Sequence, residues 1–283
     1  MNIIHCKKPI SDEGRAKYNF NGDLLIYQNV PAMHELVAYA DELLRDSLNR
    51  VEPAEAQHHF SPDEFLQRTM KAQTHFRKSQ TAKGYFFKAL EQCGVDLNST
   101  YYDHFPMRIV PTDKAYDGAH CGVISHHRDT WGSNIHSQIN WWAPLYELEE
   151  ERTIGLYPDY WQNPIANNTD TWRFEDFLKQ RVDTGHEHAG SYASAPSLLE
   201  TVDESGVVKV MLEPGDIVSF ASAHLHASVP NSTKFTRFSV EMRSINKDDL
   251  VNNRAAPNVD NAATTPMYQW FRNILSKEKL SPE

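Results

Sequence analysis

The sequence of 283 residues contains few cysteines, only Cys6, Cys93 and Cys121. They form no CxxC pair, and their odd number excludes complete internal pairing. A disulfide framework and a cysteine-based zinc site are therefore not predicted. Free thiols that serve as small hydrophobic side chains are typical of a reducing compartment, so we expect a cytoplasmic protein.

Long apolar runs and an excess of positive charge are also missing. No segment could span a bilayer, and the first twenty residues lack the apolar run of a signal peptide. The 28 Lys and Arg against 38 Asp and Glu give a formal net charge of -10. Such a balance disfavours nonspecific binding to nucleic acid or to an anionic membrane. We expect a globular protein without a nucleic-acid partner or an integral membrane segment, and leave its oligomeric state open.

No internal repeat or linker divides the chain, so a single domain over residues 1–283 is predicted, with residues 1–100 as a helical support. Residues 23–30 have the pattern of a strand. The helical pattern that follows places Leu36, Ala40 and Leu44 on one face. Two further helical patterns lie between residue 61 and residue 94, and Ser61 is a suitable N-cap for the first of them.

After residue 100 the apolar pattern changes to short runs of β type, separated by turn signals such as the Glu-Pro-Gly-Asp of residues 213–216. Seven or eight strands behind a helical front predict a mainly β fold, a double-stranded β-helix (jelly-roll) barrel over residues 101–246. An insertion at about 159–205 interrupts it and contains a helical pattern. Insertions this long are often functional. Residues 247–283 form a C-terminal tail.

One polar motif, SHHRDTWGSN at residues 125–134, stands at the end of a predicted strand. His127 and Asp129 lie two residues apart, so both side chains can point to one face. His-x-acid triplets also occur by chance, and a polar strand end is the simple alternative. His226 ends a second β run in SFASAHLHASVPN. Two histidines and one carboxylate form the facial triad of non-haem iron(II) oxygenases.

The choice among neighbouring histidines rests on strand parity. His126 points away from the face that His127 shares with Asp129, so His127 is the predicted ligand. Arg237 begins the last predicted strand, eleven residues after His226. A guanidinium group binds a carboxylate through two parallel hydrogen bonds, which a dicarboxylic co-substrate requires.

These residues resemble a known family when they are taken together. The set His127-x-Asp129, His226 and Arg237-x-Ser239 resembles the iron(II)/2-oxoglutarate-dependent dioxygenases. The interval of eleven residues is similar to the phytanoyl-CoA dioxygenase branch of that family. The resemblance covers the predicted barrel, whereas the first hundred residues match only as a helical support.

The resemblance implies a non-haem dioxygenase that hydroxylates a C–H bond. Iron(II) would be bound by the two histidines and the aspartate, with 2-oxoglutarate and O2 as co-substrates. Arg237 would bind the C5 carboxylate of 2-oxoglutarate, with a hydrogen bond from Ser228 or Ser239. Asp129 argues against a halogenase, in which a small residue replaces the carboxylate.

Further candidates surround this motif. Gln138 and Asn140 share the polar face of a mid-sheet strand, and are either co-substrate or substrate contacts or satisfied structural amides. Thr130 and Trp131 follow the ligands as candidate substrate contacts at the rim, with simple packing as the alternative. Arg108 is a further candidate substrate contact.

Other polar residues receive a simpler interpretation. We expect Arg108 and Arg243 to be solvated on the outer face, with added positive potential inside the barrel as the alternative. His186 and His188, in the insertion, are interpreted as loop residues because no third ligand is close in the sequence.

The substrate is indicated by a wider pattern. The string HRDTW…Q.NWW.P, with YPDYW downstream, is similar to bacterial hydroxylases of Kdo (3-deoxy-manno-octulosonic acid), the sugar acid of lipopolysaccharide. This similarity implies a small-molecule or lipopolysaccharide-type substrate. The alternatives are a hydroxylase of an amino acid or another small acid, a non-catalytic metal-binding jelly-roll protein, and a metal-dependent sugar isomerase. Only the hydroxylases need an arginine at position 237 to bind a carboxylate, whereas the metal-binding protein and the isomerase do not.

Overall fold

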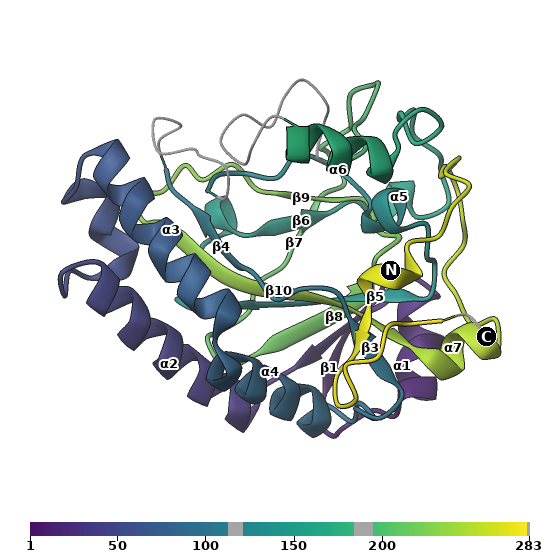
Figure 1. Cartoon of the computed structure of the whole chain (residues 1–283), viewed down its shortest axis with the longest axis horizontal. Helices are drawn as coiled ribbons and strands as arrows, with labels where there is room; N and C mark the ends of the chain where they lie inside the picture. Colours follow the sequence, from purple (N-terminus) through teal and green to yellow (C-terminus); the bar gives the residue numbers. More distant parts are fainter. Residues whose placement is uncertain (113–120, 184–194, 282–283) are drawn as a thin grey trace.

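The computed structural model describes residues 1–112, 121–183 and 195–281. Two β-sheets face each other, and a layer of helices covers the outer face of the larger sheet (Figure 1). Among the described helices, none has the length and apolar character that crossing a membrane would require.

The larger sheet has the strand order β1-β2-β8-β5-β10-β3-β11, with β4 also paired to β10. The central strand β5 is antiparallel to both of its neighbours, β8 and β10. The strands of this sheet are β1 (Ile3–Cys6), β2 (Leu24–Tyr27), β3 (Thr100–Tyr102), β4 (Met107–Val110), β5 (Gln138–Pro144), β8 (Ile217–Ala221), β10 (Arg237–Asn246) and β11 (Arg272–Asn273).

The smaller sheet has the order β7-β6-β9, with β6 (Ile154–Leu156), β7 (Val208–Lys209) and β9 (His226–Ser228). A bridge between His127 and His226 adds the segment before Asp129 to its edge. Along the chain, β4, β5, β8 and β10 belong to the larger sheet, while the His127 segment, β6, β7 and β9 belong to the smaller. Antiparallel strands that alternate in this way between two facing sheets form a double-stranded β-helix, so the predicted jelly-roll fold is confirmed.

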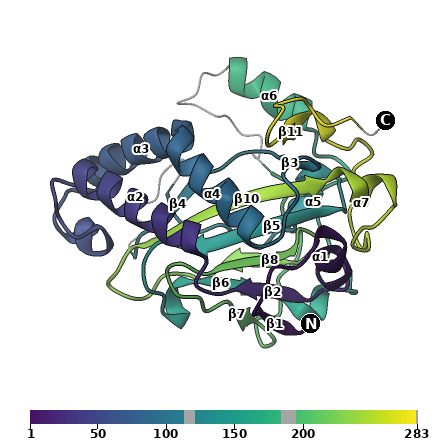
Figure 2. The ribbon, with the colours of Figure 1, turned by 90° about the horizontal axis from the view of Figure 1, so that it is seen from below.

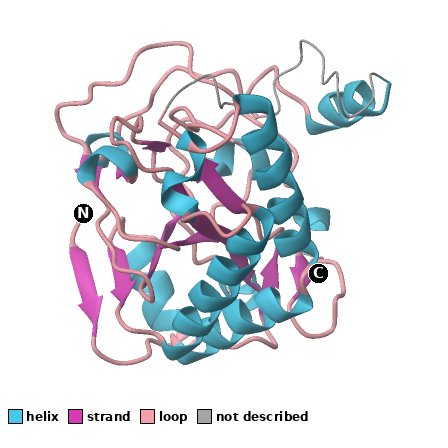
Figure 3. Cartoon of the chain, turned by 90° about the vertical axis from the view of Figure 1, so that its left-hand side faces the viewer, coloured by secondary structure: helices cyan, strands magenta, loops and turns pink. Residues whose placement is uncertain are grey.

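Helices α2 (Pro31–Ser47), α3 (Pro62–Lys78) and α4 (Gln80–Gln92) pack against the larger sheet (Figures 2 and 3). The predicted apolar face of α2 explains this packing, since Leu36, Ala40 and Leu44 are fully buried. Each leucine buried in this way contributes roughly 1.5–3 kcal/mol. Ser61 caps α3 by accepting a hydrogen bond from the Glu64 N–H. Helix α1 (Asp12–Asn19) precedes β2.

Strand β10 has two chemically different faces. Phe238, Val240 and Met242 belong to the core beneath the helices. The alternating positions Arg237 and Glu241 line the cavity between the sheets. Because side chains alternate along a strand, a single strand supplies both the core and the cavity.

The insertion and the tail meet above the barrel. Helix α6 (Phe174–Asp183) lies in the predicted insertion, and the tail contains helix α7 (Lys247–Val251) and strand β11. The rings of Phe174 and Trp270 lie 3.9 Å apart in an edge-to-face contact. The tail therefore contributes to the structure around the cavity as well as to the sheet edge.

Two local predictions differ from the structure. The β run that His226 is predicted to end is not continuous, because β8 ends at Ala221 and β9 begins at His226, with a turn between them. The motif after His127 was expected to continue as a strand end. Instead, helix α5 (Asp129–Ser133) begins at Asp129 and ends at Asn134, whose backbone is left-handed (φ 51°).

Candidate metal centre and cavity

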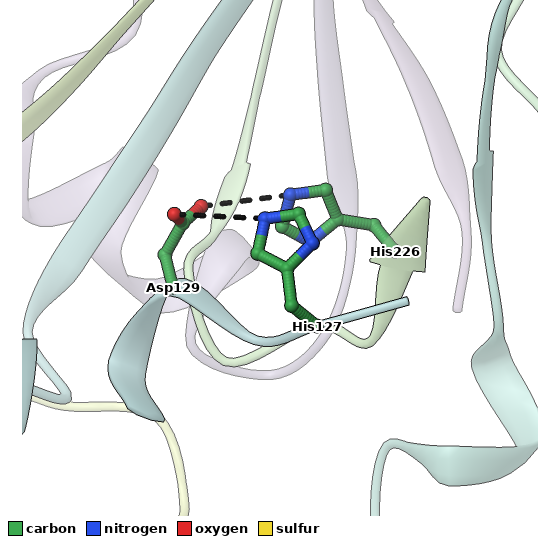
Figure 4. A group of neighbouring side chains, drawn as sticks. All are labelled: His127, Asp129 and His226. Atoms are coloured by element: carbon green, nitrogen blue, oxygen red, sulfur yellow. Dashed lines mark ion pairs between the residues drawn. The ribbon is translucent and has the colours of Figure 1, made fainter. Parts of the chain in front are cut away.

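His127, Asp129 and His226 form a compact group between the two sheets (Figure 4). Backbone hydrogen bonds of 3.0 Å in both directions hold His127 beside His226. One potential ligand atom from each of the three residues lies within 4.8 Å of the others. Three side chains from two segments thus present two nitrogens and a carboxylate to one point, which suits a divalent metal ion.

Both histidines are held in the orientation that a metal ligand needs. His127 Nδ1–H donates to the Ser125 carbonyl at 2.8 Å, and His226 Nδ1–H donates to the His224 carbonyl at 3.0 Å. Each Nε2 is then left with a free lone pair, 3.8 Å and 3.5 Å from the Asp129 carboxylate. Burial, together with the neighbouring His226, lowers the pKa of His127 to about 4, so this ring is neutral at physiological pH.

The Asp129 carboxylate is fixed through both of its oxygens. Arg243 Nη1 donates to Oδ1 at 2.8 Å, and Asn140 Nδ2 donates to Oδ2. Burial alone would raise the pKa of Asp129, but Arg243 and the two histidines hold the pKa well below its usual range. The carboxylate is therefore ionised and oriented before any ligand arrives.

Arg243 contradicts the prediction that it lies on the outer face. It lines the cavity, and its Nε donates to Asp103 Oδ2 at 2.6 Å while its Nη1 binds Asp129. The reason is parity, because Arg243 lies six residues after Arg237 on β10 and faces the same side. Asp103, which directly follows β3, was missed. Its only signal in the sequence was a lone acid directly after an aromatic strand.

Arg237 is a buried cation with an incomplete set of partners. It is 2% exposed, donates to the Thr153 carbonyl through Nη1, and donates to Ser228 Oγ at 3.1 Å through Nη2. Its Nε is buried without a hydrogen-bond partner, and no carboxylate of the described residues lies within ion-pair distance. Burial, with repulsion from Arg108, lowers the pKa of Arg237 to about 9. A cation in this condition lacks an anion.

The two candidate serines lie beside this arginine. Ser228 Oγ accepts hydrogen bonds from Arg237 and from the Ile124 N–H at 3.1 Å. Ser239 is fully buried on the same face of β10, and its hydroxyl has no hydrogen-bond partner. Both hydroxyls are placed to serve the pocket around Arg237, although Ser239 does not itself line the cavity.

Arg108 also lines the cavity, so the expectation of a solvated outer-face position is wrong for this residue as well. It lies opposite Ser239 in the pairing of β4 with β10, and its Nη2 donates to Glu241 Oε1 at 2.8 Å. Glu241 was missed. Burial alone would raise the pKa of Glu241, but Arg108 holds this pKa below its usual value. The alternation of Arg237, Glu241 and Arg243 between apolar residues was the available signal.

Three candidates lie away from the cavity. Trp131 is fully buried and its Nε1–H donates to Asp260 Oδ1 at 2.7 Å. Thr130 is 1% exposed, and both residues belong to α5, which turns them away from the space in front of Asp129. Gln138 is fully buried and donates to Ser222 Oγ at 2.9 Å. The packing alternative fits Thr130 and Trp131, whereas Gln138 Oε1 is buried without a hydrogen-bond partner, so Gln138 is not a fully satisfied structural amide. Asn140 lines the cavity and donates to Asp129.

The neighbouring histidines have other partners. His126 Nε2 lies 2.8 Å from Glu204 Oε1, and its ring packs on Tyr157. His224 lies in the turn before β9, where its Nε2 lies 3.0 Å from the Gly22 carbonyl. Burial lowers the pKa of His224 to about 3. Neither belongs to the metal-binding group. His186 and His188 lie outside the described residues.

The triad and Arg237 line one cavity of about 1080 Å³, a volume that suits a co-substrate together with a second small molecule. Arg237 and Ser228 lie at one end of the lining. Beyond the triad, the wall contains aromatic residues of the insertion and of the tail, namely Trp172, Phe174, Phe177 and Trp270.

No protein-family model matches the sequence, and no curated protein matches it significantly. Solved structures with a similar arrangement include the nickel complex of a non-heme monooxygenase, ThoJ, at 16% identity and a TM-score of 0.43, covering 82% of this chain and 77% of that one. The α-ketoglutarate-dependent epimerase SnoN of nogalamycin biosynthesis aligns at 16% identity and a TM-score of 0.42, covering 82% of each chain. EvdO2 of Micromonospora carbonacea var. aurantiaca aligns at 12% identity and a TM-score of 0.45, covering 86% of this chain and 94% of that one. Because these likenesses are distant, the function proposed below is derived from the geometry of the site.

Proposed function

We propose that the protein is a non-haem iron(II)/2-oxoglutarate-dependent dioxygenase that hydroxylates a C–H bond of a small or glycan-linked polar substrate. The observation that carries this proposal is the buried Arg237, which has an unpartnered Nε and no acid partner among the described residues. It lines the same cavity as the two-histidine, one-carboxylate group. A carboxylate on a metal-bound co-substrate would supply the missing anion.

The donor set fits iron(II). His127 Nε2, His226 Nε2 and one oxygen of Asp129 would hold the metal, leaving coordination positions open for 2-oxoglutarate and O2. Bound there, iron and 2-oxoglutarate would supply the oxidising chemistry. Arg237 would hold the distal carboxylate of 2-oxoglutarate, with the hydroxyl of Ser228 beside it.

The residues of the chain would orient the reactants and limit the access of water. Asn140 and Arg243 keep the Asp129 carboxylate in one orientation, and the Ser125 and His224 carbonyls keep the imidazoles in one tautomer. The buried position of Arg237 strengthens its attraction for an anion, because little water competes there.

The alternative functions make weaker use of these residues. A structural metal site or a sugar isomerase would use the triad but gives no reason for a buried arginine without an acid. The resemblance of residues 127–144 to Kdo hydroxylases supports a sugar acid as the substrate, and a small amino acid or another acid is the second candidate. Both are substrates of the same reaction class.

The proposal is tested by adding iron(II) and 2-oxoglutarate to the protein without oxygen. We expect the weak visible charge-transfer band of a metal-bound 2-oxo acid. Arg237→Ala should weaken 2-oxoglutarate binding by about 2–5 kcal/mol, at least about 30-fold, because a buried charge pair loses one partner. Its affinity for iron should not change, and the exposed Arg50→Ala serves as the control.

Absence of the band with metal demonstrably bound would refute the oxygenase. Equal losses of iron and 2-oxoglutarate affinity in Arg237→Ala would assign the arginine a structural role instead. For the substrate, a Kdo-bearing lipopolysaccharide precursor should increase succinate formation and gain the mass of one oxygen. Succinate without any such gain would direct the search to amino acids.

A further inference from the structure

The cavity is strongly cationic for a chain whose formal net charge is -10. Five arginines and three carboxylates line it: Arg77, Arg108, Arg237, Arg243, Arg272, Asp103, Asp129 and Glu241. The three acids are already engaged, because Arg243 binds two of them and Arg108 binds the third. The acids of the cavity therefore cannot neutralise the remaining arginines.

The proposed cofactors do not remove this excess. Iron(II) carries two positive charges and 2-oxoglutarate two negative charges, while Asp129 and Arg237 balance each other. The rest of the described lining then holds four arginines against two carboxylates, Asp103 and Glu241. Low-dielectric cavity walls concentrate such an excess and attract ions of the opposite charge.

Arg77 and Arg272 carry the unbalanced charge. Arg77 lies in the last turn of α3 and Arg272 in β11, and both are exposed at the cavity. Within the described residues, neither is within ion-pair distance of a carboxylate. Burial and the charges of Lys277 and Arg77 lower the pKa of Lys83, so Lys83 and Lys277 add to the positive potential around Arg77. Arg77, Lys83 and Lys277 are therefore near one another, and Arg77 and Arg272 are the two exposed cations that line the cavity.

Aromatic side chains also line the cavity, and one of them lies just before β11 in the chain. Phe174 begins α6 and Trp172 lies two residues before it, with ring centres 6.2 Å apart, and Trp270 of the tail contacts Phe174. Trp270 is two residues before Arg272 in the chain. Flat apolar surfaces of this kind pack against a ring or an apolar body. We name these three residues the aromatic wall.

We propose that the substrate is a small organic anion with a cyclic or apolar body, whose acid group binds at Arg77 and Arg272 and whose body packs on the aromatic wall. This inference rests on the proposed function only in calling the bound molecule a substrate. A carboxylate and a phosphate share the chemistry that arginine recognises, so the experiment contains both.

The experiment measures binding of matched probes by ligand-observed NMR and calorimetry, without oxygen. The probes are glucuronate, cyclohexanecarboxylate and glucose 6-phosphate, each beside its uncharged counterpart: glucuronamide, cyclohexanecarboxamide and glucose. They are added to the protein loaded with iron(II) and 2-oxoglutarate, and separately to the metal-free protein. At least one acid should bind about tenfold more tightly than its uncharged partner, and raised salt should reduce the difference.

Variants assign the two parts of the site. The double variant Arg77→Gln/Arg272→Gln should lose the preference for the acid, while Arg50→Gln, exposed and distant in the chain, should keep it. Trp270→Ala should weaken cyclohexanecarboxylate about fivefold or more but keep the preference for acid over amide. If no acid is preferred, or if the double variant keeps the preference, the proposal is wrong.

The two proposals fail in different ways. A charge-transfer band without any preference for acids overturns the anionic substrate and leaves the dioxygenase intact. A preference for acids that needs Arg77 and Arg272, in a protein that gives no band, supports the anion site and overturns the dioxygenase. Preference for glucose 6-phosphate over both carboxylates would identify phosphate as the acid group.

Discussion

Strand β10 carries two arginines that face the same cavity and have opposite surroundings. Arg243 binds two carboxylates, Asp103 and Asp129, through its Nε and Nη atoms. Arg237 has a carbonyl and a serine hydroxyl as partners and no acid among the described residues. Two arginines of one strand therefore have different roles. Arg243 fixes a metal ligand, and Arg237 is left ready for an anion from outside.

The comparison indicates that Arg243 stabilises the cavity, whereas Arg237 is available to bind a ligand. Two acids compensate the charge of Arg243, and its pKa is raised by Asp103 and Asp129 although burial acts against them. The charge of Arg237 is not compensated, and burial lowers its pKa to about 9. A buried ion without a partner destabilises a fold until a ligand neutralises it. A buried charge with a strongly shifted pKa is typical of a binding site.

The largest expected effect distinguishes the metal ligands from their neighbours. His127→Ala and His226→Ala should each abolish measurable iron(II) binding, a loss larger than the about 100-fold that removal of an outer partner can produce. His126→Ala and His224→Ala should keep the metal at reduced stability, since their rings contact Tyr157 and Trp161. Iron titration of the four variants measures this. Loss of metal in His224→Ala with retention in His226→Ala would show that His224, and not His226, is the metal ligand.

A single substitution tested at both arginines sharpens the comparison directly. Arg243→Met should lower the free energy of unfolding by about 2–4 kcal/mol, because it leaves Asp103 and Asp129 unpaired. Arg237→Met should leave the ligand-free protein unchanged or more stable, because it removes an uncompensated charge. Denaturant unfolding of both variants gives the signs. Equal destabilisation would mean that Arg237 is as structural as Arg243.

The stability of the metal-free protein should also depend on pH. Burial is the main cause that lowers the pKa values of His127 and His224 from the ordinary 6.5 to about 4 and about 3 in the fold. Between those values and 6.5 the unfolded chain binds more protons, so the stability of the metal-free protein should fall as the pH falls. Over its whole window, His127 contributes about 3 kcal/mol and His224 about 5 kcal/mol.

His224→Phe keeps a ring in place and should remove a large part of this pH dependence. Arg237 keeps its charge throughout this range, so Arg237→Met should leave the pH dependence unchanged. Unfolding curves between pH 4 and pH 7 provide the measurement. A flat profile in the unmodified protein would contradict neutral buried histidines.

The smallest effect concerns two amides of β5. Asn140→Ala should weaken iron binding about 10- to 100-fold, since the Asp129 carboxylate loses a partner that orients it. Gln138→Ala should weaken iron binding less than Asn140→Ala, because Gln138 is linked to Asp129 indirectly, through Ser222 and Asn140. Both variants are expected to lose some stability, so affinity is the property to compare. Similar iron affinities in the two variants would contradict an orienting role for Asn140.

The sequence alone determined the features that depend on local periodicity and order along the chain. The period of two in the strands and the apolar face of α2 predicted a helical support in front of a jelly-roll barrel. Strand parity also selected His127 over His126, and the structure places His127, Asp129 and His226 in one group. These predictions needed only the alternation of a strand and the turn of a helix.

Only the tertiary structure decided which polar residues share the cavity. Helix α5 turns Thr130 and Trp131 away from Asp129, and the end of β8 at Ala221 places His224 in a turn. Asp103 reaches Arg243 across 140 positions of the chain. Such contacts depend on how distant strands pair, and a single strand carries no record of its partner. The tertiary structure also decided that no described carboxylate lies within ion-pair distance of Arg237, because the sequence does not show which side chains meet in the cavity.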